Sequence, residues 1–370
     1  MPKAKYKKRK DGRYCANIQT GYDEITGKRK FKTIYAYSIA DLERKKADII
    51  VKLEKGILVE DKGITVEQWA NKWIDTYKTG KSYKTYQMYD NVIRNHINKE
   101  LGSIKVKDLK QIHIQKLIND RHAIGRTRLL EQIKITINQI LESAIDNNLI
   151  YKNVCRSIEM PSKIKKEKRA LYDYEKSSLK KADLTLMQSS LVNILYYCGL
   201  RRGEVLGLTK NDIKNDKIDI NKTLVFEKNK GVIKPMPKSE AGIRKIPIPK
   251  ELNAILTPYL NSINTLYLFT KKDGTIMTES SFRKLWTRII NKMNIANGGT
   301  DKLKTITGLT PHVFRHNYAT FLYYAGIKIK DAQYLLGHKS VDITLNIYTH
   351  LDKENNETIQ KLDSYFASQN

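Results

Sequence analysis

The sequence predicts a multidomain protein that is mainly α-helical with small β-sheets. Three observations lead to this fold class. The length of 370 residues exceeds one ordinary domain, apolar residues recur at helical spacing through most of the chain, and strand-like segments interrupt them within 13–37 and 217–248. We expect three domains, at residues 1–60, 64–160 and 169–370, each with a core of its own.

The first domain carries turn and strand signals followed by one helical segment. Asp11-Gly12 is a turn signal, and Ser38 is the expected N-cap of a helix that runs to about Lys55. We therefore expect a three-stranded sheet packed by one helix. The segments before the helix are a basic lead at 3–10, then 13–20 and 28–37, and the helical residues predicted to face inwards are Ile39, Leu42, Ile49 and Leu53.

The middle domain follows a polar hinge and is expected to be a bundle of about four helices, from Thr65 to about Ile150. Basic residues at 81–84 and 121–128 would either contact phosphate groups or be solvated surface charges. The apolar residues that keep helical spacing, and so are predicted to face the core, are Trp69, Trp73, Ile74, Tyr77, Ile133, Ile137, Ile140, Leu141 and Ala144.

The third domain begins after a short charged segment, 162–169, which has the composition of a linker. Helical patterning then runs to Leu208, and strand-like segments follow at 217–225 and 243–248. Helices are predicted for most of the remainder. The third domain is therefore expected to be mixed α+β and mainly helical.

The charge balance favours nucleic acid as a partner. The chain has 68 Lys and Arg against 39 Asp and Glu, a net charge of +29 spread along its length. Such an excess repels itself unless a polyanion offsets it, although solvated Lys-rich surfaces remain an alternative. No segment has the length and apolarity of a membrane span, and no secretory signal is recognisable, so we expect a cytoplasmic, nucleoid-associated protein without a membrane partner.

The first motif with chemical content ends one helix and starts another. In the segment 196–204, Gly199 is the expected helix end, so that Arg201 lies near the first turn of the next helix. Glu204 follows one turn later on the same face. The arginine is placed to bind an anion, but a surface Arg–Glu pair is the alternative.

A second motif places three cationic or titratable side chains on one helix face. Thr310 and Pro311 are a fitting N-cap and first helical residue. His312, Arg315 and His316 then fall at positions i, i+3 and i+4. These three side chains can be buried together only if they meet an anion. A zinc site is disfavoured because an arginine lies between the two histidines and no carboxylate accompanies them.

A third motif lies near the end of the chain. Gly337 is the expected end of a helix, followed by His338, and Ser340 is the expected N-cap of another helix. On that helix Val341 and Leu345 are predicted to share a face with Tyr348. The tyrosine is either a core residue or a nucleophile, since a phenol becomes reactive only where a neighbour accepts its proton.

These motifs resemble those of the tyrosine recombinase (phage integrase) family. The matching segments are GLRRGE, HVFRH, LGH and NIYTH, and His338 follows Arg315 by 23 residues and precedes Tyr348 by 10, both usual for the family. The resemblance implies two phosphate-binding arginines, two histidines in hydrogen bonding and proton transfer, a nucleophilic tyrosine and two carboxylates in structural support. In that order they are Arg201, Arg315, His312, His338, Tyr348, Glu204 and Asp212.

The resemblance also implies a lysine in a β-hairpin that protonates the departing 5′ oxygen. Lys238 is our choice, and Ser239 follows it where the family usually has a threonine. The neighbouring lysines remain competitors for this role, and these are Lys228, Lys230, Lys234 and Lys245.

For the rest of the chain the resemblance implies an arm-type DNA-binding domain at 1–60, a core-binding domain at 64–160 and the catalytic domain at 169–370, as in integrases of conjugative transposons and temperate phages. The expected partner is double-stranded DNA with core and arm sites. A helix within 355–366 would dock on a neighbouring subunit of a DNA-bound homotetramer or pack on its own domain. Candidate accessory partners are an excision factor and a host DNA-bending protein.

The expected function is site-specific recombination that integrates and excises a mobile element through a 3′-phosphotyrosyl intermediate. The intermediate conserves the energy of the broken bond, so the reaction is expected to need neither metal nor ATP nor another cofactor. Two alternatives remain: a DNA-relaxing enzyme similar to type IB topoisomerases, and a basic DNA-binding regulator without catalysis.

Overall fold

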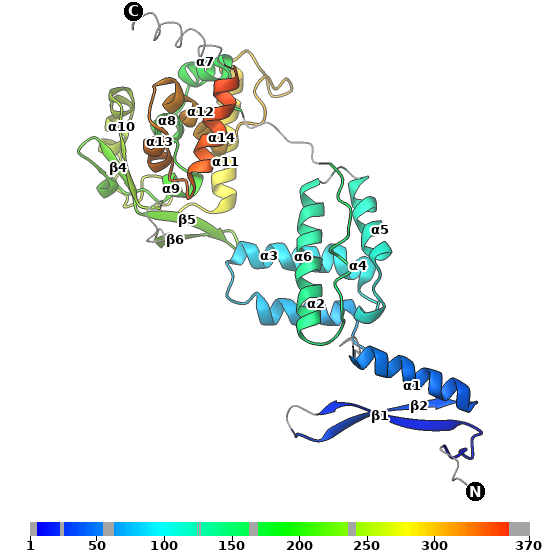
Figure 1. Ribbon diagram of the computed structural model, residues 1–370. Helices are drawn as coiled ribbons and strands as arrows, with labels where there is room; N and C mark the ends of the chain where they lie inside the picture. Colours follow the sequence, from blue (N-terminus) through cyan, green and yellow to red (C-terminus); the bar gives the residue numbers. More distant parts are fainter. Residues whose placement is uncertain are drawn as a thin grey trace, which may run out of the picture. The chain divides into compact units, whose positions relative to one another are not determined.

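The structure is a computed structural model, and it describes residues 6–22, 26–54, 63–123, 125, 127–162, 169–235 and 242–354. The chain forms two compact units, Met1–Lys165 and Lys166–Asn370 (Figure 1). The first unit contains two separate hydrophobic cores, one beneath a small sheet and one inside a helical bundle. The second unit is mainly helical with small antiparallel sheets.

The N-terminal sheet consists of two antiparallel strands, β1 (Tyr14–Tyr22) and β2 (Arg29–Ala36), packed by α1 (Ile39–Glu54). The prediction of a third strand is wrong for the described residues. Lys8 forms only an isolated bridge with Tyr14. A tight turn, in which the amide of Gly12 donates to the carbonyl of Arg9, folds this segment back beside the start of β1, where the described residues form no strand beyond that bridge.

Two predicted core residues lie on the surface. Leu42 and Ile49 of α1 are buried and Leu53 packs against them, but Ile39 is exposed because it is the first residue of the helix. Tyr77, the last residue of its helix, is also exposed, and its hydroxyl accepts a hydrogen bond from Asn147 at 3.1 Å. A helical spacing pattern therefore overestimates burial at helix ends.

The helical bundle buries all the other residues predicted for its core. They include Trp69 and Trp73 of its first helix and five residues of its last and longest helix. Thr65 caps the first helix: its hydroxyl accepts from the amide of Gln68, whose side chain accepts from the amide of Thr65. The elements are α2 (Val66–Tyr77), α3 (Tyr83–Val92), a π-helix (Ile93–Ile97), α4 (Asn98–Leu101), a 3₁₀ turn (Val106–Asp108), α5 (Gln111–His122) and α6 (Thr127–Asp146).

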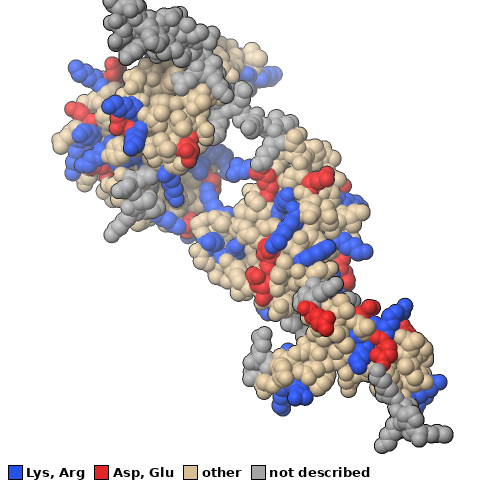
Figure 2. Space-filling model, viewed as in Figure 1, with Lys and Arg blue, Asp and Glu red and all other residues tan. Residues whose placement is uncertain are grey.

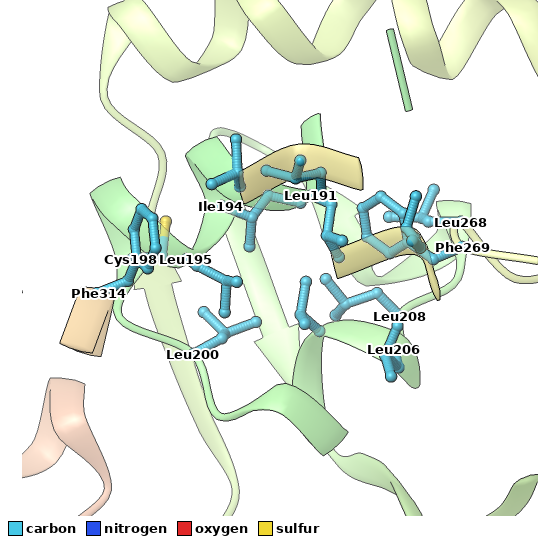
Figure 3. Packing of buried hydrophobic residues seen from close by; sticks show 14 of the residues in the cluster. Leu191, Ile194, Leu195, Cys198, Leu200, Leu206, Leu208, Leu268, Phe269 and Phe314 are labelled. Atoms are coloured by element: carbon cyan, nitrogen blue, oxygen red, sulfur yellow. The ribbon is translucent and has the colours of Figure 1, made fainter. Parts of the chain in front are cut away.

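The second unit is built around α8, which is apolar on nearly all sides and lies in the middle of the largest core (Figure 3). Leu191, Ile194, Leu195 and Cys198 of this helix pack among residues of several other elements. The helices of the unit are α7 (Asp173–Lys181), α8 (Leu186–Cys198), α9 (Arg202–Leu206), a 3₁₀ turn (Lys210–Asp212), α10 (Lys250–Ser262), α11 (Glu279–Ala296), α12 (Pro311–Tyr324), α13 (Ile329–Leu336) and α14 (Val341–Glu354).

The strands of the second unit form two sheets. The predicted strand at 217–225 is broken at Asn221, whose side-chain amide donates to Asp212. The part before the break pairs with the strand predicted at 243–248, and the part after it forms a separate hairpin. The strands are β3 (Ile213–Lys214), β4 (Lys217–Ile220) and β7 (Arg244–Pro247) in one sheet, and β5 (Lys222–Glu227) and β6 (Lys230–Pro235) in the other.

Among the helices that the structure describes, none combines the length and the apolar character needed to cross a lipid bilayer.

Candidate active site

The end of α8 positions the first motif. Gly199 has φ +61°, in the left-handed region, and its amide donates to the carbonyl of Leu195. The chain turns there and starts α9 with Arg201 as its N-cap residue. The predicted helix break is thus confirmed, and it brings the arginine to the beginning of the second helix.

Arg201 and Glu204 form the expected pair, but the side chain of Glu204 is almost fully buried while that of Arg201 is 39% exposed. One oxygen of Glu204 accepts from the backbone amide of Arg201 at 2.8 Å, and the other accepts from its Nη1 at 2.8 Å. The second terminal nitrogen of Arg201 donates to the carbonyl of Gly337 at 2.7 Å. The pair is therefore not an isolated surface contact, since it links the first and third motifs.

Arg315 is buried, with 5% of its surface exposed, and it donates to two backbone carbonyls from distant parts of the chain. Its Nη1 lies 3.0 Å from the oxygen of Gly199, and its Nη2 donates to the oxygen of Leu336. Burial, with a smaller contribution from the positive charge of Arg201, lowers the pKa of Arg315 from its ordinary value. An anion that entered the site would relieve this excess of positive charge.

His338 follows the end of α13 at Gly337, which has φ +62°. Its ring is buried, and its Nδ1 is 2.9 Å from the hydroxyl of Thr344. Burial, together with the charges of Arg315 and Arg201, lowers the pKa of His338 to about 3. The imidazole is therefore neutral at physiological pH and able to exchange a proton.

His312 lies at the beginning of α12 and faces solvent, with its ring centroid 5.7 Å from that of His316. It borders a cavity of about 360 Å³ that Arg201 also lines. The remaining lining residues are Arg202, Gly203, Thr310 and Pro311. The predicted helix start at Thr310 and Pro311 is confirmed, and the cavity provides open space beside the guanidinium of Arg201.

Tyr348 is buried in a small hydrophobic cluster of α12, α13 and α14, with its ring centroid 5.2 Å from that of Tyr323. Its hydroxyl donates to the carbonyl of Ile327 at 3.2 Å. Burial raises the pKa of Tyr348 to about 12. Val341 and Leu345 lie on the same helix at the predicted spacing from Tyr348, but both are exposed, so the stripe that they form with it is not a buried one.

Asp212 is held at the break between β4 and β5. It accepts hydrogen bonds from the amide and the hydroxyl of Thr209, and it pairs with Lys222. Burial opposes ionisation, but the bonds from Lys222 and Thr209 outweigh it and lower the pKa of Asp212. This carboxylate joins the small sheets to the segment after α9, whereas Glu204 contacts Arg201 directly.

Lys238 lies outside the described residues, between Pro235 of β6 and Gly242. Of its competitors, Lys234 pairs with Glu227 and Lys245 lies 3.9 Å from Asp219. Lys228 is in the tight turn between β5 and β6, and Lys230 follows that turn. The choice of Lys238 stays a prediction.

One buried residue of the site was missed from the sequence. Arg244 begins β7, and its side chain has no exposed surface. Its two terminal nitrogens donate to the two oxygens of Glu204, at 3.1 and 2.8 Å, and its Nε donates to the carbonyl of Leu335 at 2.9 Å. The available signal was strand periodicity, because Arg244 has the same inward position as Ile246.

Two family models match the chain. The model described as "Phage integrase family" matches residues 164–355, and the model described as "Phage integrase, N-terminal SAM-like domain" matches residues 65–121. Among curated proteins, a tyrosine recombinase XerC-like protein of Caldanaerobacter subterraneus subsp. tengcongensis is 27% identical over 399 aligned residues. That alignment covers 98% of this chain and 99% of the relative.

Two solved structures are similar in fold. The Tn1549 transposon integrase in complex with transposon right end DNA has a TM-score of 0.68 and 22% identity, covering 82% of this chain and 99% of that chain. A lambda integrase tetramer bound to a Holliday junction has a TM-score of 0.60 and 17% identity, covering 92% of this chain and 94% of that chain.

Proposed function

Because this chain belongs to the phage integrase family and is a tyrosine-type site-specific recombinase, we propose that DNA is its substrate and Tyr348 its nucleophile. Its function is recombination that integrates and excises a mobile element. The observation that carries the residue assignment is the meeting of Arg201, Arg315 and the neutral His338 at the end of α13. Two fixed guanidinium groups and a proton-exchanging imidazole suit a phosphodiester.

In the proposed reaction the hydroxyl oxygen of Tyr348 attacks a DNA phosphorus atom. The P–O5′ bond breaks as the P–O(Tyr) bond forms, which leaves a 3′-phosphotyrosyl link and a free 5′ hydroxyl. The phenol proton passes to a histidine, His338 or His312, and Lys238 supplies a proton to the departing oxygen. The hydroxyl of a partner strand then reverses the step, so no external energy source is required.

The roles of the arginines follow from their surroundings. Arg201 is partly exposed beside a cavity, whereas Arg315 is held from behind by two carbonyls. The single carboxylate of Glu204 does not balance the positive charges of the arginines around it. A phosphate in the cavity would neutralise the remainder. The hydrogen bond from the hydroxyl of Tyr348 to the carbonyl of Ile327 must break before the attack, because the phenol proton has to pass to another acceptor.

The experiment that tests this proposal uses nicked duplexes that carry the ends of the mobile element, incubated with the full chain in EDTA. We expect a denaturation-resistant adduct that maps to Tyr348. Tyr348→Phe should bind the same DNA and form no adduct. Tyr324→Phe, at an exposed tyrosine that ends α12, is the matched control and should form it. An adduct with Tyr348→Phe would refute the assignment.

Strand exchange separates the two remaining alternatives. A relaxing enzyme would form the adduct and relax supercoiled DNA without joining strands of different duplexes. A regulator would bind the DNA and form no adduct. Recombinant strands joined between two labelled duplexes are the expected product.

We also propose that 1–60 binds arm sites and 64–160 core sites, while 169–370 carries the chemistry. Lys and Arg side chains occur on the surfaces of both units (Figure 2), which supports contact with DNA along the chain. The sheet face opposite α1 carries Asn17 and Thr33, hydrogen bonded at 2.8 Å, with Tyr35 beyond them. Amide and hydroxyl groups are suited to reading base edges.

Asn17→Ala combined with Thr33→Ala tests the arm assignment. The double variant should lose affinity for arm DNA while adduct formation on core DNA stays unchanged. Substituting Lys46 on α1 by Ala removes a charge from the helix and serves as the control. An unchanged affinity of the double variant for arm DNA would refute the arm assignment.

A homotetramer on DNA, joined by exchange of the tail at 355–366, completes the proposal. The tail lies outside the described residues, and support comes from the fold shared with lambda integrase, which forms a tetramer on a Holliday junction. Removing 355–370 should abolish strand exchange between duplexes and leave DNA binding intact. An excision factor and a DNA-bending host protein remain candidate accessory partners.

A further inference from the structure

Three arginines of the second unit donate to three consecutive backbone carbonyls. Arg244 donates to Leu335, Arg315 to Leu336 and Arg201 to Gly337. These carbonyls form the C-terminal end of α13, where the helix offers oxygens without partners inside the helix and a partial negative charge. His338 is the next residue, so the three guanidinium groups together fix the position from which its imidazole projects.

Glu204 connects two of these arginines. Both of its oxygens accept from Arg244, and one of them also accepts from Nη1 of Arg201 while the other accepts from the backbone amide of Arg201. Burial alone would raise the pKa of Glu204, but the bonds and charge of Arg244, with the charge of Arg201, lower it to about 2. The carboxylate is thus ionised, and its orientation is set from the buried side by Arg244.

Arg244 itself is too deeply buried to contact DNA. Its side chain has no exposed surface, in contrast with the 39% exposed side chain of Arg201. All three donor positions that it uses point at Glu204 or at Leu335. Any effect of this residue on the reaction must therefore pass through other residues.

We propose that Arg244 is a positioning residue of the recombinase. It aligns Arg201 through Glu204, and through Leu335 it fixes the end of α13, from which His338 projects. This inference rests on the proposed function of those residues. Arg244 also begins β7, six residues after Lys238, so it anchors the chain on the C-terminal side of the predicted general acid. One side chain then connects the first and third sequence motifs with the strand that follows the lysine.

A lysine at this position would not perform the same task. The planar guanidinium reaches both oxygens of Glu204 and the carbonyl of Leu335 at once, in fixed directions. An ammonium group keeps the positive charge that balances Glu204 but cannot donate in these three fixed directions. Arg244→Lys therefore removes the alignment of Glu204 while it keeps the compensating charge.

The chain offers a matched control for this substitution. Arg169 also holds a fully buried carboxylate with two bonds, from its Nη1 and Nη2 to Glu175, at 2.6 and 2.7 Å. That pair lies in the same unit, and Arg169 donates to Ala170, Glu175 and Thr307, not to any residue of the candidate site. Arg169→Lys therefore disturbs a similar buried fork without touching the proposed alignment.

The test measures the first-order rate of adduct formation at saturating DNA, together with the Kd for DNA, in the full chain. For Arg244→Lys we expect the rate to fall at least 10-fold while the Kd changes less than 3-fold. Arg169→Lys should change both less than 2-fold. In an Arg201→Lys background, adding Arg244→Lys should lower the rate by a smaller factor than in the wild-type background, because the part of the effect that passes through the guanidinium of Arg201 is already lost.

A second variant covers the case in which Arg244→Lys does not fold. Arg244→Gln keeps a planar hydrogen-bond donor in place of the guanidinium, and Glu204 keeps its ion pair with Arg201. This variant should fold and show a similar loss of rate. A rate within 2-fold of wild type for either variant would overturn the inference, as would multiplied effects in the Arg201→Lys background. If the wild-type chain forms no adduct, the proposed function fails instead.

Discussion

The ring of Tyr318 occupies the space that a side chain on Gly199 would need. A Cβ on Gly199 would lie 2.4 Å from Cδ1 of Tyr318, and the glycine has a positive φ of +61°. The carbonyl of the same glycine accepts the bond from Arg315. The close approach of α8 to α12 therefore determines how the first two motifs meet.

Gly199→Ala should destabilise the protein and slow adduct formation. Left-handed strain costs about 1–2 kcal/mol and the overlap with Tyr318 about 1–3 kcal/mol, so the free energy of unfolding should fall by about 3 kcal/mol. We expect a loss of rate of about 10-fold or more. Gly308→Ala is the control, because Gly308 has φ +73° with no atom near the added carbon. Denaturant unfolding that gives equal losses for the two would contradict this reading.

Thr344→Val should slow the reaction without weakening DNA binding. The substitution keeps the shape of the side chain but removes the hydroxyl that lies 2.9 Å from Nδ1 of His338. The imidazole then loses the group that orients it, and we expect a loss of adduct rate of about 10-fold. Thr257→Val on α10, whose hydroxyl bonds only within its own helix, should leave the rate unchanged. A normal rate for Thr344→Val would exclude an orienting role.

His338 should make the stability of the protein sensitive to acid. Its pKa is about 3 in the folded chain and about 6.5 when unfolded, so its contribution is complete above pH 6.5 and is lost as the pH falls from 6.5 toward 3. Below pH 6.5 we expect this residue alone to lower the free energy of unfolding by about 1 kcal/mol per pH unit. His338→Gln should show a flatter dependence between pH 6.5 and 5. Parallel curves for the two proteins would show that the histidine does not titrate in this way.

Lys238 should be needed only where the leaving group requires a proton. Lys238→Ala is expected to slow cleavage of ordinary DNA strongly, by about 100-fold or more. On DNA with sulfur in place of the bridging 5′ oxygen, the variant should approach the wild-type rate, because a thiolate leaves without protonation. Lys228→Ala and Lys234→Ala are the controls. If one of them shows the sulfur-dependent recovery instead, that lysine is the general acid.

Much of the site could be predicted because its residues follow local signals. The glycines at 199 and 337 end helices, and Thr310 with Pro311 starts one, and these boundaries decide where Arg201, Arg315 and His338 lie. Such signals depend on a few neighbouring residues and are readable in the sequence. The resemblance of the three motifs to those of one family then linked them to a common site.

The remaining features depend on contacts between distant residues. The role of Arg244 requires Glu204, 40 residues earlier, and the break at Asn221 requires Asp212. Likewise packing on α12 and α13 decides which residues of α14 are buried, so the spacing of Val341 and Leu345 did not reveal that both are exposed. Periodicity identifies an amphipathic helix but does not identify its partner.

The cluster that holds Tyr348 is separate from the main core around α8. It comprises a few side chains of α12, α13 and α14, so α14 has far fewer buried groups to lose than α8 when it opens. Opening free energies differ between such regions, and amide hydrogen exchange reports them. The amides of α14 should therefore exchange well before those of α8, which means that the helix bearing the nucleophile can detach and return while the rest of the catalytic unit stays folded.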